Sequence, residues 1–199
     1  MYEVETKIKI DNLDRLIKKL KDLNAIKSAI LDQLDIYYNY PVESRDFSKT
    51  DEALRLRKTT ESDPKTLENL KEVVDLTYKG PNLDKVIKTR VEHVCHVIEV
   101  EKIKEILKAL SFKEIISINK HRVAYDLDYN DNKIEVLIDT IEHLPGSYFE
   151  AEILVKDNKL IDSYKNVLFS FIQECGYSKK DILPNTYLEM VLEKIAMKN

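Results

Sequence analysis

Hydrophobic and charged residues alternate along much of the chain, beginning with its first ten residues. Successive side chains of a strand point to opposite faces. Val4 and Ile8 therefore share one face of the first expected strand, and Glu3, Glu5 and Lys7 share the other. Because charges keep this register on one segment after another, we expect them to line a common surface. The alternating segments predict strands at 2–10, 33–40, 52–59, 73–80, 86–98, 118–129, 133–141 and 148–156.

Four other segments repeat hydrophobic residues at three- and four-residue intervals, which is typical of amphipathic helices. Asp11 or Asn12 can cap the first of them, and Gly176 suits the C-terminal end of the third. Residues 60–72 are polar and charged, and we expect a loop or short helix there with no site. The helical patterns predict helices at 13–23, 100–110, 160–172 and 185–195.

Eight strands with a few inserted helices predict an α+β fold dominated by an antiparallel sheet. An open sheet of that size usually curls or closes. We therefore expect these strands to form one large sheet that curls or closes, with flanking helices. The chain carries no long-period repeat, low-complexity tract or linker, so residues 1–199 are expected to form a single domain.

The charged faces of these strands differ in sign along the chain. Arg55 and Arg57 share a face in the middle of the sequence, as do Lys120 and Arg122, whereas the first strand and the last two supply mainly carboxylates. A solvated sheet face explains any single strand well, since Lys, Arg and Glu are its usual occupants. A solvated face does not explain why basic and acidic residues are sorted onto different strands.

Charge enclosed in a closed barrel requires compensating ligands. A polyanion would satisfy the arginines and lysines, and a hard divalent cation such as Mg²⁺ would satisfy the carboxylates, because Mg²⁺ binds carboxylate and phosphate oxygens together. The residue types alone thus indicate metal-assisted phosphoryl or nucleotidyl transfer.

Overall composition narrows the class of protein. The net charge of -4 provides no basic field for nucleic acid, and the longest apolar runs, such as Val136 to Ile138, are far too short to span a membrane. Asp11 and Asp14 stand where a signal peptide would need an apolar core, so we expect a cytoplasmic protein. Only three glycines are present, and no phosphate-binding glycine loop is found.

The remaining polar and aromatic candidates have ordinary structural explanations. Cys95 and Cys175 lie in apolar patterns and are expected to be buried free thiols. Tyr37 and Tyr38 could stack on a base or form a structural aromatic pair. The C-terminal helix is expected to pack under the barrel. Surface or core positions are expected for the four histidines, His93, His96, His121 and His143.

The N-terminal pattern Glu3-x-Glu5-x-Lys7 resembles the ExExK signature of the CYTH superfamily, the triphosphate tunnel metalloenzymes. The resemblance covers nearly the whole chain and keeps the family's order of motifs. Further matching segments are Gln33-x-Asp35-x-Tyr37-Tyr38, Leu54-Arg55-Leu56-Arg57, Thr77-Tyr78-Lys79-Gly80-Pro81, Arg90-x-Glu92, Lys120-x-Arg122, Asp139, Gly146-Ser147-Tyr148-Phe149-Glu150-Ala151-Glu152 and Asn185-Thr186-Tyr187-Leu188-Glu189-Met190-Val191.

This resemblance implies an α+β fold in which an eight-stranded antiparallel closed β-barrel with flanking helices forms a tunnel. The tunnel is expected to bind a triphosphate along its axis together with Mg²⁺ or Mn²⁺. The resemblance also implies roles for individual residues. Triphosphate binding falls to Lys7, Arg55, Arg57, Lys79, Arg90, Lys120 and Arg122. Metal binding falls to Glu3, Glu5, Asp139, Glu150 and Glu152, of which Glu5, Glu150 and Glu152 are also the expected catalytic carboxylates.

The family divides by nucleophile, and the resemblance implies either branch. The Gln33-x-Asp35 strand and the short chain are most similar to the class IV adenylyl cyclases, which convert ATP to cyclic AMP and pyrophosphate. The alternatives are a triphosphatase for tripolyphosphate, thiamine triphosphate or a nucleoside triphosphate, and a non-catalytic module that binds polyphosphate or nucleotide. The expected partner is a nucleoside triphosphate or inorganic triphosphate, and a homodimer is compatible with a small barrel.

Overall fold

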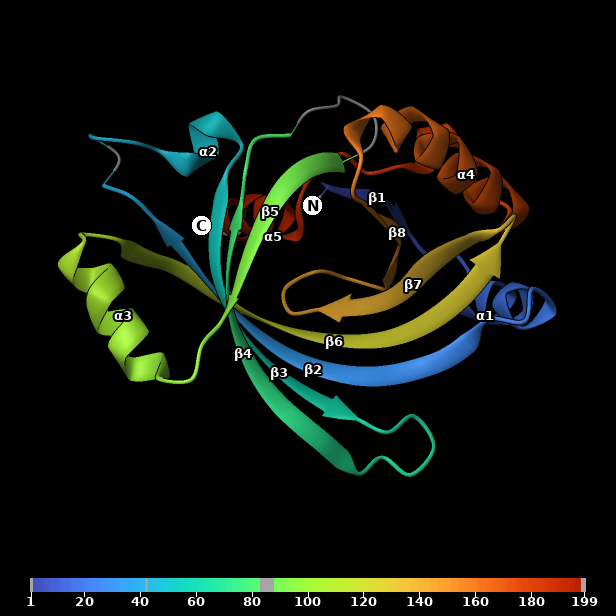
Figure 1. Cartoon of the computed structure of the whole chain (residues 1–199), viewed down its shortest axis with the longest axis horizontal. Coiled ribbons are helices and arrows are strands. Elements are labelled where there is room, and N and C mark those ends of the chain that lie inside the picture. The colour runs from blue at the N-terminus through green and yellow to red at the C-terminus, as the bar shows by residue number, and fades with distance from the viewer. Residues whose placement is uncertain (1, 42, 83–87, 198–199) are drawn as a thin grey trace.

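Eight antiparallel strands close into a barrel in the computed structural model, which describes residues 2–41, 43–82 and 88–197. The strand order around the barrel is β1-β5-β4-β3-β2-β6-β7-β8, and β8 pairs with β1 to complete the circle (Figure 1). The closed barrel that the resemblance implies is therefore confirmed. The strands are β1 (Tyr2–Lys9), β2 (Ile26–Asn39), β3 (Ala53–Ser62), β4 (Asn69–Lys79), β5 (Lys88–His96), β6 (Lys113–Tyr129), β7 (Asn132–Ile141) and β8 (Tyr148–Val155).

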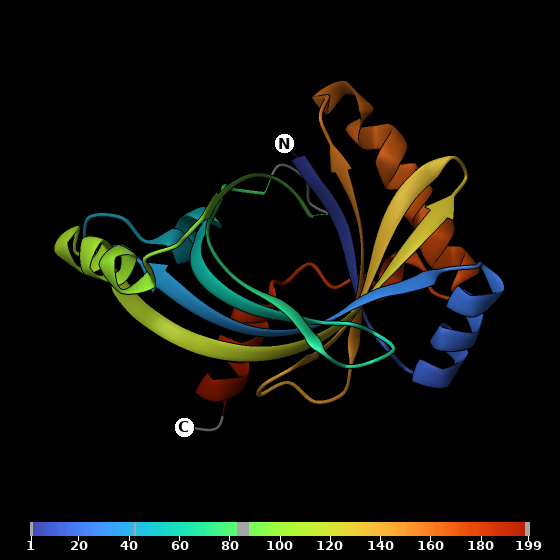
Figure 2. The ribbon, with the colours of Figure 1, turned by 60° about the horizontal axis from the view of Figure 1, so that its bottom comes forward.

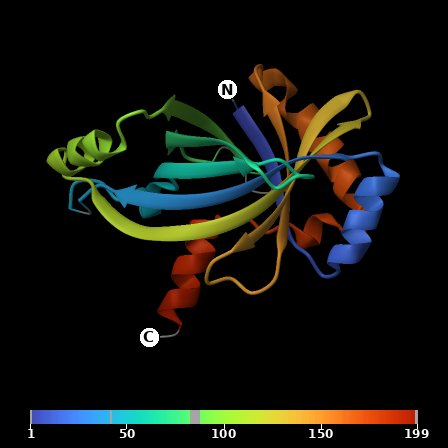
Figure 3. The ribbon, with the colours of Figure 1, turned by 90° about the horizontal axis from the view of Figure 1, so that it is seen from below.

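The helices stand outside this barrel in three places. In Figures 1 and 2, α3 lies at one end of the molecule, and α1 and α4 lie at the other. Figure 3 shows α5 projecting from a further side, apart from both groups. The helices are α1 (Leu13–Asp22), α2 (Phe47–Thr50), α3 (Val100–Ala109), α4 (Ile161–Glu174) and α5 (Tyr187–Ala196), with short 3₁₀ turns at Asn158–Leu160 and Lys179–Asp181.

Three hydrophobic cores join the helices to the barrel. The largest core joins α1 and α4 to the strands β1, β6, β7 and β8, and it contains Val4, Leu16, Phe149 and Phe171, each with 1% or less of its surface exposed. A second core packs α2 and α3 over β2 and β3, and a third packs α5 beside β2, β6, β7 and β8. In the first two cores apolar residues occupy the outward positions, which leaves the alternating charged positions to face inward. The third core lies on the inward face, because Tyr148 has the same strand parity as Glu150.

Local signals define the helix ends as the sequence predicted. The Asn12 side chain accepts a hydrogen bond from the backbone N–H of Arg15 and caps α1. Gly176 follows α4 with a φ of +87°, the left-handed conformation that glycine adopts without steric cost. The short helix α2 was not predicted from the periodicity, because four residues are too few to show one.

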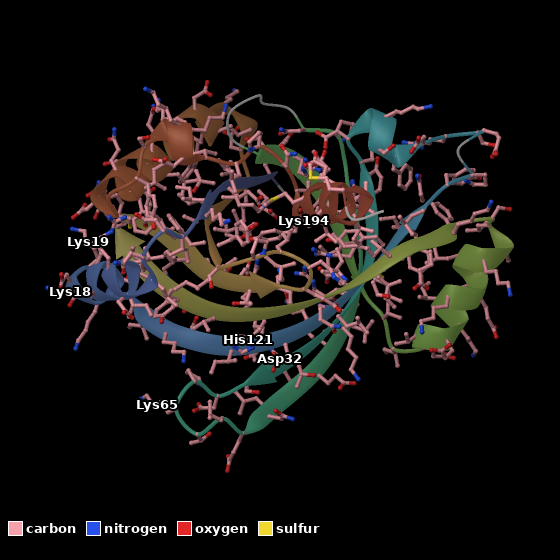
Figure 4. All side chains as sticks on the ribbon, turned by 180° about the vertical axis from the view of Figure 1, so that it is seen from behind. Lys18, Lys19, Asp32, Lys65, His121 and Lys194 are labelled. Atoms are coloured by element: carbon pink, nitrogen blue, oxygen red, sulfur yellow. The ribbon has the colours of Figure 1, made fainter. Side chains whose placement is uncertain are left out.

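The prediction of a loop without strands at 60–72 is wrong. Strand β3 continues to Ser62 and β4 begins at Asn69, so the two form a long hairpin around a connection at residues 63–68. Lys65 marks its tip in Figure 4. The ion pairs Lys58–Glu72 and Glu61–Lys71, both 2.9 Å long, join the two strands. Both faces of this hairpin are polar, and a strand without an apolar face gives no alternation.

Smaller differences concern strand bounds and one cysteine. Strands β2 and β6 begin earlier than expected, at Ile26 and Lys113. The first residues of the strand predicted at 86–98 lie outside the described residues, and the described strand begins at Lys88. Cys175 is buried as predicted, but the prediction that Cys95 is buried is wrong. Cys95 is exposed because it lies outside the three apolar clusters.

In the part of the chain that the structure describes, no helix has both the length and the hydropathy to cross a lipid bilayer.

Candidate functional site

The interior of the barrel contains a cavity of about 280 Å³, here called the tunnel cavity. The strands place their inward charged side chains around it because they alternate, with period two, with the outward core residues. Every residue predicted for the site lines this cavity except Asp139, which is fully buried in the wall. The predicted lining residues are Glu3, Glu5, Lys7, Arg55, Arg57, Lys79, Arg90, Lys120, Arg122, Glu150 and Glu152.

Three of these carboxylates, Glu3, Glu5 and Glu152, converge at one side of the tunnel cavity and are called the carboxylate cluster. Each contributes an oxygen atom, and these atoms lie within 4.8 Å of one another. The register of β1 against β8 produces the convergence, since it sets Glu5 directly opposite Glu152. Oxygen atoms held this close suit a hard divalent cation, which binds oxygen ligands almost exclusively.

Electrostatics within the carboxylate cluster are unfavourable in the protein alone. Burial, together with the charge of Glu150, raises the pKa of Glu5 to about 7. Burial and the charge of Glu3 raise the pKa of Glu152 well above its ordinary value. Like charges held together out of water disfavour ionisation. A divalent cation among these groups would relieve the repulsion, so the residues present fit a metal ion.

Glu150 and Asp139 make a different set of contacts from the carboxylate cluster. Asp139 receives two hydrogen bonds from Arg122, from Nε to Oδ1 at 2.6 Å and from Nη2 to Oδ2 at 2.7 Å. Arg122 also contacts Glu150, whose Oε1 lies 3.1 Å from the ammonium of Lys7. Although burial opposes it, the charges of Lys7 and Arg122 hold the pKa of Glu150 well below its ordinary value. These two carboxylates are already neutralised by the protein's own cations.

Tyr187, from the start of α5, closes this chain of contacts into a ring. Its hydroxyl donates to Oδ2 of Asp139 at 2.9 Å, and the ammonium of Lys7 lies 4.1 Å from the centre of its aromatic ring. The ion-pair ring, as we name it, consists of Lys7, Glu150, Arg122, Asp139 and Tyr187. The C-terminal helix was expected to pack under the barrel. Tyr187, at its start, was not among the predicted site residues.

A further group of cations lines the same tunnel cavity as the carboxylate cluster. Arg57 forms a two-pronged pair with Asp35, and Nη1 of Arg55 lies 4.0 Å from the same carboxylate. Although burial opposes it, the charges of Arg57 and Arg55 hold the pKa of Asp35 well below its ordinary value. Lys79 pairs with Glu92 and lies 3.5 Å from Glu3.

Arg90 differs from these cations because its partner comes from outside the barrel strands. Its guanidinium lies 3.3 Å from Oδ1 of Asp51, in the segment that follows α2. Asp51 is itself half-exposed, whereas Arg90 is buried. The segment around α2 therefore borders the tunnel cavity, to which Phe47 and Ser48 also contribute.

Lys120 is the exception among the cations of the tunnel cavity. It is 5% exposed, and across the described ranges no carboxylate forms an ion pair with it. Burial, together with the charges of Arg122 and Arg57, lowers its pKa to about 7. A buried ammonium without a partner is disfavoured. Lys120 therefore has unused capacity for an anion.

Asp35 and Glu92 were quoted as parts of family motifs but were not predicted as site residues. Both are inward positions of their strands, so the alternation that identified Arg57 and Arg90 would also have found them. Tyr37 and Tyr38 both border the tunnel cavity, but they pack in separate apolar clusters on opposite faces of β2. The interpretation of the two rings as one structural pair is therefore wrong.

The four histidines lie on the outer surface, away from the carboxylate cluster. Figure 4 shows His121 beside Asp32 on the outside of the neighbouring strands, at an Nδ1–Oδ1 distance of 2.7 Å. His96 pairs with Asp75, His143 lies 3.7 Å from Glu142, and His93 stacks on Tyr78. All four side chains are exposed, which is the surface alternative of the two positions expected for them.

Comparisons with known proteins give a consistent result. The model of the CYTH domain matches residues 1–187. A Methanocaldococcus jannaschii protein with the provisional name adenylate cyclase is 36% identical over 192 residues, which cover 96% of this chain and 98% of that protein. A solved structure from Pyrococcus horikoshii has 34% identity and a TM-score of 0.81, and the match covers 96% of this chain and 99% of that one.

A more distant structure comes from Hippeastrum. That protein is described as an adenylyl cyclase candidate with a dominant triphosphatase activity. It has 13% identity and a TM-score of 0.63, and the match covers 96% of this chain and 95% of that one. At this level of identity the similarity shows a shared fold.

Proposed function

The chain belongs to the CYTH family, and from that premise we propose that it is a metal-dependent enzyme that converts ATP to cyclic AMP and pyrophosphate inside its barrel. The observation that carries the proposal is that one cavity is lined both by the carboxylate cluster and by the seven cations predicted to bind the triphosphate, here called the tunnel cations. A nucleoside triphosphate bound to a divalent cation supplies the charges that both groups require. The provisional name of the archaeal relative supports the same activity.

The carboxylate cluster would hold the metal ion. Glu3, Glu5 and Glu152 offer oxygen ligands at one point, and a bound Mg²⁺ or Mn²⁺ would polarise phosphate oxygens and neutralise charge that develops on them. Glu150 and Asp139 were also predicted as metal ligands. Their ion pairs with Lys7 and Arg122 favour a different role, which is to hold those two cations in place.

The tunnel cations would bind the triphosphate. Arginine forks match phosphate oxygens in a bidentate geometry, and lysine ammoniums act as point charges. The cations in this role are Lys7, Arg55, Arg57, Lys79, Arg90, Lys120 and Arg122.

In the proposed reaction the 3′-hydroxyl oxygen of ATP forms a bond to the α-phosphorus. The bond from this phosphorus to the oxygen that bridges to the β-phosphate breaks, and pyrophosphate leaves. The hydroxyl proton passes to a lining carboxylate, a role open to Glu5, Glu150 and Glu152. Apolar side chains at the cavity wall, Phe47, Ile115, Leu188 and Leu192, favour a substrate with an organic group on the triphosphate.

A triphosphatase is the second candidate. All of the charged groups of the tunnel cavity can be satisfied by three linked phosphates and a metal ion, without any contact from a nucleoside. Water would then attack the terminal phosphate in place of the 3′-hydroxyl. The dominant triphosphatase activity of the Hippeastrum protein, which has the same fold, is consistent with this alternative.

Product analysis tests the proposal. The protein is incubated with ATP or with tripolyphosphate, in Mg²⁺ or Mn²⁺, and the products are resolved by phosphorus NMR. Cyclic AMP with pyrophosphate supports the cyclase. Orthophosphate from tripolyphosphate, with ATP left intact, identifies a triphosphatase instead. Binding without turnover under every condition would reduce the protein to a binding module.

Two matched variants link the activity to the site. Glu152→Gln should abolish turnover yet preserve most of the triphosphate affinity, because the tunnel cations remain. Glu72→Gln is the control, since Glu72 is about half-exposed on the β3–β4 hairpin and does not line the tunnel cavity. Its turnover should stay within about threefold of the parent, as expected for a change that leaves the site's contacts in place.

A further inference from the structure

The five members of the ion-pair ring come from five elements that are distant in sequence. Lys7 lies on β1, Arg122 on β6, Asp139 on β7 and Glu150 on β8, and all four strands belong to the barrel. Tyr187 is the member from outside the barrel, at the first residue of α5. The C-terminal helix therefore touches the interior charges directly, through one side chain.

Tyr187 contacts the ring at two separate points. Its hydroxyl donates to Asp139, which has no exposed surface and whose two oxygens are otherwise engaged by Arg122. Its aromatic face lies under the ammonium of Lys7, and the same ammonium donates to the backbone carbonyl of Asn185 at 3.4 Å. Tyr187 thereby bridges the two ends of the chain Asp139–Arg122–Glu150–Lys7.

We propose that Tyr187 is a positioning residue, which fixes Lys7 and Arg122 in the orientation that the reaction at the triphosphate requires. This inference rests on the proposed function. Lysine side chains have many rotamers, and a cation–π contact combined with a hydrogen bond restricts them. Arg122 is oriented through Asp139, because the Tyr187 hydroxyl holds the carboxylate that receives the guanidinium fork.

A purely structural role for Tyr187 is the competing explanation, and Tyr148 offers the comparison within the same cluster. The two rings pack edge to face with their centroids 5.7 Å apart, and both lie beside Val191 of α5. The Tyr148 hydroxyl, however, lies 3.5 Å from the carbonyl of Pro145 and does not reach the ion-pair ring. A Tyr→Phe change at each position thus removes one hydroxyl from the same apolar environment.

The experiment compares Tyr187→Phe with Tyr148→Phe in steady-state kinetics on the substrate found by product analysis. Tyr187→Phe should lower kcat by roughly tenfold and change KM by less than about threefold, because the charges that bind the triphosphate remain and only their placement is loosened. Tyr148→Phe should leave both constants within about twofold. Equal kinetic constants for the two variants, or a loss confined to the melting temperature, would overturn the inference.

A third variant separates this inference from the proposed function. Tyr187→Leu removes the hydroxyl and the aromatic face, so it should also weaken the binding of tripolyphosphate, by about tenfold in calorimetry. If the parent protein shows no turnover, the proposed function fails, and the calorimetric comparison still decides the role of Tyr187. Tripolyphosphate affinities that agree within twofold for Tyr187→Leu and Tyr148→Phe would then contradict it.

Discussion

The carboxylate cluster and the ion-pair ring share the strands β1 and β8 but differ in how their charges are balanced. Glu5 faces Glu152 across the β1–β8 pairing, and two residues further on Lys7 faces Glu150. In the Glu5–Glu152 pair two like charges are buried together, whereas in the Lys7–Glu150 pair opposite charges neutralise each other. The ring is neutralised within the protein. In the cluster, Lys7 lies 3.5 Å from Glu5 and Lys79 lies 3.5 Å from Glu3, and an added cation would further stabilise the ionised form.

Lys120 is the cationic counterpart of the carboxylate cluster. It is buried beside other cations and has no carboxylate partner within the described residues. The interior therefore combines charges that are neutralised in advance and charges that require a ligand. Paired cations are held in place by their carboxylate partners, and the unpaired groups add a requirement for ligand charge.

The largest effect is expected from breaking the ion-pair ring. Arg122→Met leaves Asp139 fully buried without its main partner, and removal of one member of a buried pair typically costs 3–5 kcal/mol, so we expect a loss of about 4 kcal/mol in the free energy of unfolding. Urea denaturation measures it. Arg15→Met is the control, because the Arg15–Asp11 pair is about half-exposed and such a pair contributes little to stability. Similar losses in the two variants would refute the distinction.

The next effect concerns the carboxylate cluster. Glu152→Gln should weaken Mn²⁺ binding by about a hundredfold, since one of three charges near the ion is removed. The rise in melting temperature with Mn²⁺ measures it. Glu150→Gln is the informative contrast, because Glu150 belongs to the ring, and its Mn²⁺ affinity should fall by less than about tenfold. The reverse order would place the metal at Glu150.

The third prediction uses the pH dependence of Lys120. Its pKa in the folded protein is about 7, below the ordinary value of 10.5. Between these values the unfolded chain binds more protons at this lysine, so the contribution of Lys120 to stability increases as the pH rises from about 7 to 10.5. A bound triphosphate should raise the folded-state pKa and restore the proton.

Calorimetry at pH 8 in buffers of different ionisation enthalpy tests this linkage. Binding of tripolyphosphate should take up close to one more proton in the parent than in Lys120→Arg, because arginine stays charged. The facing groups are Arg57, Arg122, Asp35 and Asp139, and none of them changes in the comparison. Equal proton uptake in the two proteins would mean that Lys120 is already charged before binding.

The smallest effect is expected on the outer wall. Asp32 and His121 lie as close together as the members of the ring, but their side chains are 63% and 51% exposed. Asp32→Asn should change the free energy of unfolding by less than about 0.5 kcal/mol and leave turnover unchanged. Asp139→Asn, at a position with no exposed surface, should cost several times more. Comparable values would show that burial does not separate the two faces.

Much of the inner wall could be predicted because a strand's side chains alternate with a fixed period. Arg55, Arg57, Lys120 and Arg122 were placed inside by parity alone, and all four line the tunnel cavity. Asp35 obeys the same rule, because it lies directly opposite Arg57 on the neighbouring strand, although it was not predicted as a site residue. The hairpin beyond Thr60 could not be predicted in this way, since its strands carry polar residues on both faces.

The roles of Glu150 and Glu152 could not be separated from the sequence. The two residues are identical, lie two positions apart and face the same way. Their difference arises from β1, whose Lys7 and Glu5 lie opposite them. The strands β1 and β8 are separated by most of the chain, and no local pattern encodes the register between them.

By itself, the sequence determined most of the secondary structure, the inward and outward faces of most strands, and the family. These features depend on local periodicity and on motifs whose order can be read along the chain. The tertiary structure decided which charges meet. It formed a cluster of three carboxylates and a closed ion-pair ring, and it left Lys120 in the interior without a carboxylate partner among the described residues. It also brought Tyr187 from the C-terminal helix to Lys7 at the N-terminus. Barrel closure makes such contacts between distant segments, and their energies depend on burial and register.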